Sequence, residues 1–96
     1  MQKYRILVDL MDNTIRSEAR QVVELSLGDP FFREANGSLV PLRNSQFFSG
    51  QRFVWTGLHD ELAEARHEAA AELSRRAEQM MRLSHQCKNL QEITNG

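Results

Sequence analysis

Two residue pairs have the side chains of a metal or nucleophile site. Glu64 and His67 show the Glu-x-x-His spacing that puts both side chains on one helix face in di-iron bundles. Such sites need a second motif and two further glutamates, so a solvated helix surface is the simpler interpretation. His85 and Cys87, two residues apart, do not share a helix face. Because Cys87 falls on an apolar stripe, it is expected to be a buried, inert thiol.

No other pattern indicates catalysis. The glycines are isolated turn residues, without a phosphate loop, a dinucleotide fingerprint or a nucleophile elbow. Carboxylate pairs such as Asp9/Asp12 and Asp60/Glu61 lack a spacing that marks acid–base work. We therefore expect no catalytic residues, no metal and no cofactor, and a protein that is not an enzyme.

Arginine and aromatic residues interleave in the middle of the chain. Ten of the 12 basic residues are arginine, which reflects either codon usage or a need for bidentate pairing with carboxylates and phosphates. The formal net charge of -1 disfavours a long polyanion as partner. A small phosphorylated ligand or a protein partner would contact Arg43, Phe47, Arg52 and Trp55. The alternative is that the aromatic residues simply form the core.

The length of 96 residues fits one domain or a domain with one protruding element. Cys87 is the single cysteine, which excludes a disulfide within the chain. The first apolar run is broken by Asp9 and Asp12 and is too short for a signal peptide or a membrane span. We expect a cytoplasmic protein without a membrane partner.

Short elements are predicted for residues 1–57, the first part of the chain. Alternation over 4–10 predicts a strand whose core face carries Tyr4, Ile6, Val8 and Leu10. Residues 15–27 fit a short helix followed by a strand, although a strand throughout is also open. Asn36 and Gly37 predict a β-hairpin over 31–40 with a tight type I′ turn. Further short strands are predicted at 46–48 and 52–55.

Residues 58–92 form the second part, a long amphipathic helix, and 93–96 a frayed tail. Apolar residues recur every three or four positions, and no Gly or Pro interrupts 58–91. Thr56 is the predicted N-cap. The apolar face is predicted to pack on the first part and then on a partner, with the association residues Leu62, Ala69, Leu73, Met80, Leu83 and Leu90.

Length decides how this helix is covered. More than thirty helical residues span roughly 50 Å, whereas the first part would be only about 25–30 Å across. About half of the helix therefore has no cover from its own chain. Either copies associate, as a short antiparallel pair rather than a long parallel zipper, or the helix breaks near Leu83, Ser84 and His85 and folds back.

The sequence thus predicts an α+β fold, a small antiparallel sheet followed by one long C-terminal helix. The predicted function is a non-enzymatic protein-interaction module. It forms a homodimer or small homo-oligomer and binds, in some cases inhibits, another macromolecule, most simply a protein. Small accessory proteins of phages and mobile elements share this plan. The alternative is an oligomeric binder of a small nucleotide or phosphate ligand through arginines and aromatic residues.

Overall fold

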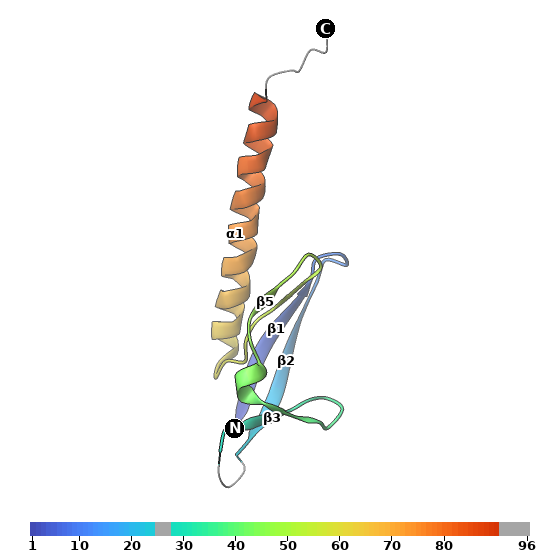
Figure 1. The fold of residues 1–96 in the computed structure, drawn as a ribbon, viewed down its shortest axis with the longest axis vertical. Coiled ribbons are helices and arrows are strands. Elements are labelled where there is room, and N and C mark those ends of the chain that lie inside the picture. The colour runs from blue at the N-terminus through green and yellow to red at the C-terminus, as the bar shows by residue number, and fades with distance from the viewer. Residues whose placement is uncertain (25–27, 91–96) are drawn as a thin grey trace.

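The computed structural model describes residues 1–24 and 28–90. The described residues form six strands, a short 3-10 helix and one long α-helix (Figure 1). In chain order these are β1 (Gln2–Asp9), β2 (Thr14–Val23), β3 (Phe31–Arg33), β4 (Leu39–Pro41), η1 (Leu42–Asn44), β5 (Phe48–Ser49), β6 (Phe53–Trp55) and α1 (Leu62–Asn89). The predicted α+β fold is confirmed.

The strands form one curled antiparallel sheet in the order β4-β3-β2-β1-β6-β5. β1 and β2 make the longest pair, in a register that runs from Gln2 opposite Gln21 to Asp9 opposite Thr14. β3 pairs with the far end of β2, and β6 pairs with the last residues of β1. The two short hairpins therefore widen the sheet at opposite ends of the long one.

The core lies between one face of the sheet and the first half of α1. Alternation along β1 places Ile6 and Val8 on this face, and Val54 of β6 is the cross-strand neighbour of Val8. The small side chains of Ala65 and Ala69 let the helix approach closely, and all five residues are buried. The predicted core face of residues 4–10 is confirmed at Ile6 and Val8. Partly buried residues around this core are Leu10, Leu62 and Leu73.

α1 begins at Leu62, four residues later than predicted, because the preceding segment still belongs to the sheet. His59 and Tyr4 exchange two backbone hydrogen bonds, with N–O distances of 2.7 and 2.8 Å. The carboxylate of Glu68 accepts a hydrogen bond from the Gly57 backbone N–H (2.9 Å). This contact ties the linker back to the helix.

Thr56 does not cap the helix, so that prediction is wrong. Its side chain is buried, and its Oγ1 accepts the Ile6 N–H (2.8 Å) and donates to the Gly57 carbonyl (2.9 Å). Glu61 is the N-cap residue and makes no capping bond with its side chain. The threonine instead satisfies a backbone donor of β1.

The prediction of a helix at the start of 15–27 is also wrong. Residues 14–23 form β2, because eight residue pairs with β1 outweigh the helical spacing of Ile15, Ala19, Val22 and Val23. The predicted strand in the later part extends into residues 25–27, which lie outside the described residues.

The hairpin of β3 and β4 is confirmed, but its turn is not type I′. Within this turn only Gly37 has a positive φ, of 89°, whereas a type I′ turn needs two residues with positive φ. The Gly37 N–H bonds to the Glu34 carbonyl, and the Glu34 N–H bonds to the Ser38 carbonyl. This is the three-residue loop in which a glycine follows a tight turn.

α1 runs unbroken through Leu83, Ser84 and His85, so a fold-back at these residues is excluded. It rises past the ends of the strands, and every residue in 77–90 is exposed (Figure 1). The radius of gyration is 19.0 Å and the longest extent is 73 Å, whereas a compact chain of this length would have a radius of about 12.5 Å. No helix in 1–24 or 28–90 has both the length and the apolarity to cross a membrane.

Candidate interaction site

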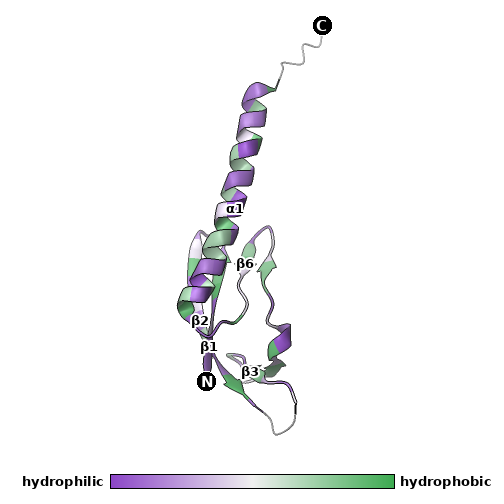
Figure 2. Ribbon diagram, turned by 90° about the vertical axis from the view of Figure 1, so that its left-hand side faces the viewer, coloured by the Kyte–Doolittle hydropathy of each residue, from purple (hydrophilic) through white to green (hydrophobic). Residues whose placement is uncertain are grey.

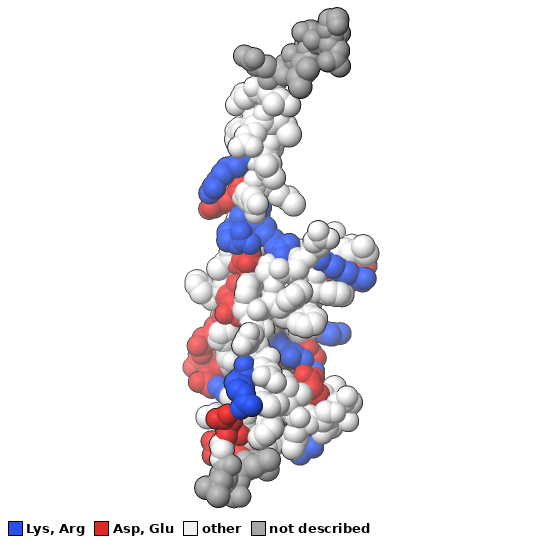
Figure 3. Space-filling view, in the orientation of Figure 1, with Lys and Arg blue, Asp and Glu red and all other residues white. Residues whose placement is uncertain are grey.

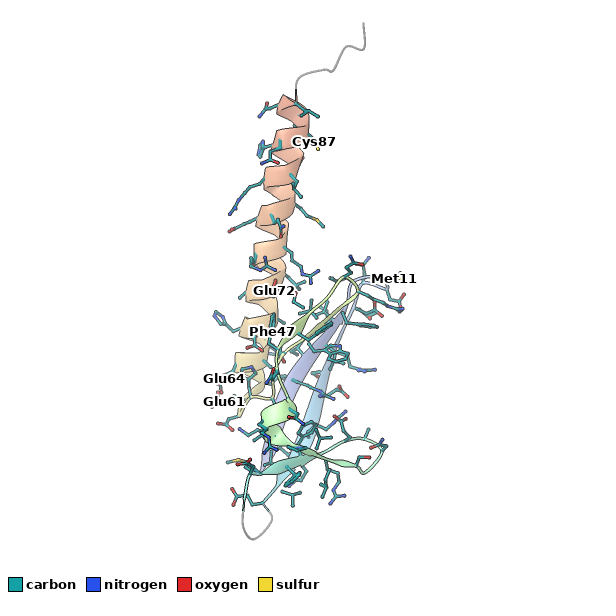
Figure 4. The ribbon with its side chains drawn as sticks, viewed as in Figure 1. Met11, Phe47, Glu61, Glu64, Glu72 and Cys87 are labelled. Carbon is teal, nitrogen blue, oxygen red and sulfur yellow. The ribbon has the colours of Figure 1, made fainter. Side chains whose placement is uncertain are left out.

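Residues 77–90, here named the projecting segment, carry an uncovered apolar stripe. Met80, Leu83 and Leu90 expose 71%, 53% and 73% of their surface, and Cys87 is exposed between them. Figure 2 shows hydrophobic residues continuing along α1 above the sheet, and Figure 4 shows Cys87 far from every strand. The expectation of a buried Cys87 is therefore wrong, because none of the strands in 1–24 and 28–61 reaches this part of the helix.

The stripe is the continuation of the buried helix face. Steps of three or four residues lead from the buried Ala69 and Glu72 through Arg76 to Met80. The sheet ends at this level: the Arg76 guanidinium donates hydrogen bonds to Ser49 Oγ (2.5 Å) and to the Gly50 carbonyl. The face stays apolar beyond Arg76 although its cover stops there.

The structure divides the predicted association residues into two groups. Ala69, Leu62 and Leu73 contact the core of their own chain. Met80, Leu83 and Leu90 have no such contacts and form the stripe together with Cys87. Only the second group is wholly available to a partner.

A notch lies at the foot of the stripe, between α1 and the turn that joins β5 to β6. Its volume is about 450 Å³. Its lining residues are Ser49, Gly50, Gln51, Arg75, Arg76, Gln79, Met80 and Leu83. Whatever covers the stripe must stop at this turn or enter the notch.

A second surface, here named the aromatic face, lies on the side of the sheet opposite α1. Phe53 and Trp55 flank the buried Val54 and point away from the helix, and Phe48 lies opposite Trp55 on β5. The ring centroids of Trp55 lie 5.3 Å from Phe48 and 6.3 Å from Phe53. These three rings expose 36–48% of their surface, so they are not core residues.

Arginines border the aromatic face. The Arg52 guanidinium lies 4.8 Å from the centre of the Phe53 ring and pairs with Asp9 (3.1 Å). The hydrogen bond from Arg52 lowers the pKa of Asp9, and the same bond raises the pKa of Arg52. A groove of about 610 Å³ runs along this edge, and the exposed Arg16 lies on it next to Leu7. Figure 3 shows charged groups of both signs beside one another, with surface that carries no Lys, Arg, Asp or Glu between them.

Further along the same side, an ion cluster covers Phe32. Arg5 pairs with Glu18 (3.2 Å) and Glu34 (3.4 Å), and Arg20 pairs with the same two carboxylates. Burial works to raise the pKa of Glu18, but the two arginines outweigh it and hold that pKa below its ordinary value. Arg5 also lies 5.9 Å above the buried Phe32 ring. The two positive and two negative charges balance, although the buried Arg20 Nε makes no hydrogen bond.

Of the predicted ligand contacts, only Arg52 and Trp55 belong to the aromatic face. Arg43 pairs with Asp29, outside this surface. Phe47 lies beside Glu72 of α1, in a groove on the other side of the sheet (Figure 4). The sequence places Phe48 and Phe53 in the same interleaved stretch and offers Arg16 as added charge, but these three residues were not selected as contacts. The signal was present in 53–55, where an apolar residue between two aromatics must alternate with them across the sheet.

The residues that could bind a metal do not converge. Among the described residues, no three His, Cys, Asp or Glu side chains come close enough together to hold an ion. Glu64 and His67 line a shallow groove on the exposed side of α1 with His59 and Glu68. His59 Nε2 lies 3.2 Å from Glu68 Oε1, and this contact helps to hold the segment before α1 against the helix.

Comparison with known proteins identifies no relative: no family model matches the chain, and neither does a curated protein or a solved structure.

Proposed function

We propose that this protein is a non-enzymatic interaction module that self-associates through the projecting segment and binds another macromolecule, most simply a protein. The observation that carries the proposal is the apolar stripe of Met80, Leu83, Cys87 and Leu90, which prolongs the buried helix face where the sheet has ended. An exposed apolar surface of this kind on a small protein is typical of an association site.

The size of the stripe supports association of moderate strength. Full burial of one Leu or Met side chain contributes about 1.5–3 kcal/mol. Met80, Leu83 and Leu90 expose between 53% and 73% of their surface, so burying all six in a dimer contributes about 6–12 kcal/mol. The loss of rotational and translational freedom on association costs about 4–15 kcal/mol. The free energy gained by burial and the cost of association are comparable. The fraction of dimer should therefore depend on protein concentration.

Light scattering over a range of concentrations tests this proposal. The wild-type chain should reach the mass of a dimer or small oligomer, and Leu83→Glu should stay a monomer because its carboxylate would be buried. His85→Glu is the matched control, since it places the same charge on the opposite, exposed helix face. A wild-type monomer at all concentrations, or equal effects of the two substitutions, would contradict the proposal.

The aromatic face supports a second candidate, binding of a nucleotide or phosphate ligand. Three exposed rings offer stacking surfaces, and Arg16 and Arg52 lie beside them. Trp55 is the only tryptophan, so its fluorescence reports on this face alone. Titration with mononucleotides and cyclic nucleotides should quench Trp55, and Arg16→Gln should weaken the response. Unchanged fluorescence up to millimolar ligand would exclude this candidate.

A further inference from the structure

We infer that the stripe is covered by the projecting segment of a second copy, which runs antiparallel to the first. Leu83 then contacts the partner's Cys87, and Met80 contacts the partner's Leu90. This arrangement rests on the self-association proposed above and specifies its geometry. A two-fold axis relates the copies, so each contact occurs twice.

The position of the sheet decides the orientation. The stripe and the body of the chain lie on the same face of α1, because the stripe continues the face that Ala69 and Glu72 bury. If two stripes met in a parallel pair, residues 62–76 of one copy would occupy the space filled by the other copy's sheet. In an antiparallel pair the two bodies lie at opposite ends of the helices and leave the stripes free to meet.

The spacing of the stripe decides the register. Met80, Leu83, Cys87 and Leu90 follow one another by three, four and three residues, the spacing of alternating a and d positions. With Leu83 opposite the partner's Cys87, all four residues of each copy enter the contact. A shift of one heptad outward leaves only Cys87 and Leu90 in contact.

A shift of one heptad inward is blocked by the β5–β6 turn. It would carry the end of the partner's helix past Arg76, where the turn is held by the hydrogen bonds from Arg76 to Ser49 and Gly50. The turn therefore acts as a stop for the partner's helix. In the inferred register that helix ends above the notch beside this turn.

Charge favours the same arrangement. The carbonyl groups at a helix C-terminus carry partial negative charge, and in the inferred register those of the partner point toward Arg75 and Arg76 at the notch. By helical spacing, uncharged side chains border the stripe, whereas the charged residues of 77–90 lie away from it: Glu78, Arg82 and Lys88. No charge within 77–90 opposes the contact.

Disulfide cross-linking between two single-cysteine chains tests the geometry. One chain keeps Cys87; the other carries Leu83→Cys with Cys87→Ser and a cleavable tag that changes its size. Both are first confirmed as associated by light scattering. After mixing and oxidation with copper phenanthroline in air, the mixed 83–87 adduct should exceed both same-residue adducts several-fold, because same-residue cysteines are offset by about 6 Å along the axis.

The outcomes separate the two proposals. Same-residue adducts that equal or exceed the mixed adduct, in chains that light scattering shows to be associated, would overturn the antiparallel register and leave self-association standing. The same result would follow if the stripe entered a groove of the second copy between α1 and β2, which is lined by Ile6, Val8, Ile15, Leu62, Ala69 and Leu73. Chains that remain monomers would overturn both proposals.

Discussion

The helicity of the projecting segment should depend on protein concentration. Residues 77–89 make up 13 of the 28 residues of α1, and all of them are exposed in the single chain. Isolated helices of about 12–15 residues or fewer are marginal in water, because most helical stability in proteins comes from tertiary packing. In a monomer this half of α1 should therefore fray, whereas residues 62–76 stay helical against the sheet.

The expected loss of helical signal follows from the number of residues in each half of α1. If the segment frays fully on dilution, just under half of the α1 signal at 222 nm is lost, since 13 of 28 residues unfold. Circular dichroism of the wild-type chain from about 1 μM to about 1 mM should show a transition that coincides with the change in mass. Because the free energy gained by burial and the free energy lost on association are of similar size, the dimer should dissociate within this concentration range.

Leu83→Glu and His85→Glu provide the controls. The glutamate at position 83 should fix the low-helicity state at every concentration, and His85→Glu should follow the wild-type curve. Wild-type helicity that stays at its full value while the protein is a monomer would refute the reasoning, because the segment would then be stable without cover.

Three further predictions concern the body of the chain. Thr56→Val should lower the free energy of unfolding in urea by about 1–3 kcal/mol, because it leaves the buried Ile6 N–H without an acceptor; Thr56→Ser should restore most of the loss, and equal effects would refute the assigned role. Val54→Ala should cost about 2 kcal/mol in the same assay, since the side chain is fully buried; a neutral result would place Val54 outside the core. The lowered pKa of Glu18 stabilises the fold above its ordinary value of 4.5 and ceases to do so as pH falls through the folded value. The stability difference between wild type and Glu18→Gln should therefore shrink below about pH 4.5, and a difference that does not change with pH would contradict the ion cluster.

The elements whose apolar residues recur at regular spacing were predictable from the sequence. The elements whose conformation depends on a distant partner strand were not. The apolar spacing of α1 and the alternation at Ile6 and Val8 report directly on burial against one surface. The helical spacing in β2 was misleading, because its state depends on the distant partner strand β1. Thr56 follows the same rule: its acceptor role depends on Ile6, fifty residues earlier.

The candidate site divides in the same way. Met80, Leu83 and Leu90 could be named because helix length exceeds the size of the body, an argument that needs no tertiary detail. The rings of the aromatic face belong to the interleaved stretch that the sequence shows, but which of them meet depends on the pairing of β5 with β6. Arg43 and Phe47 were chosen by composition, and the curl of the chain through η1 separates them from Trp55.

The reach of the β5–β6 hairpin has a consequence for how such a chain could evolve. Its turn stands at the level of Arg76, and a longer turn that bends over α1 would extend this cover by about 3.3 Å for each added residue. Met80 and Leu83 would then be sheltered by the chain's own backbone. A small insertion at one loop would thereby convert the proposed self-associating chain into a monomer, with every core residue left unchanged.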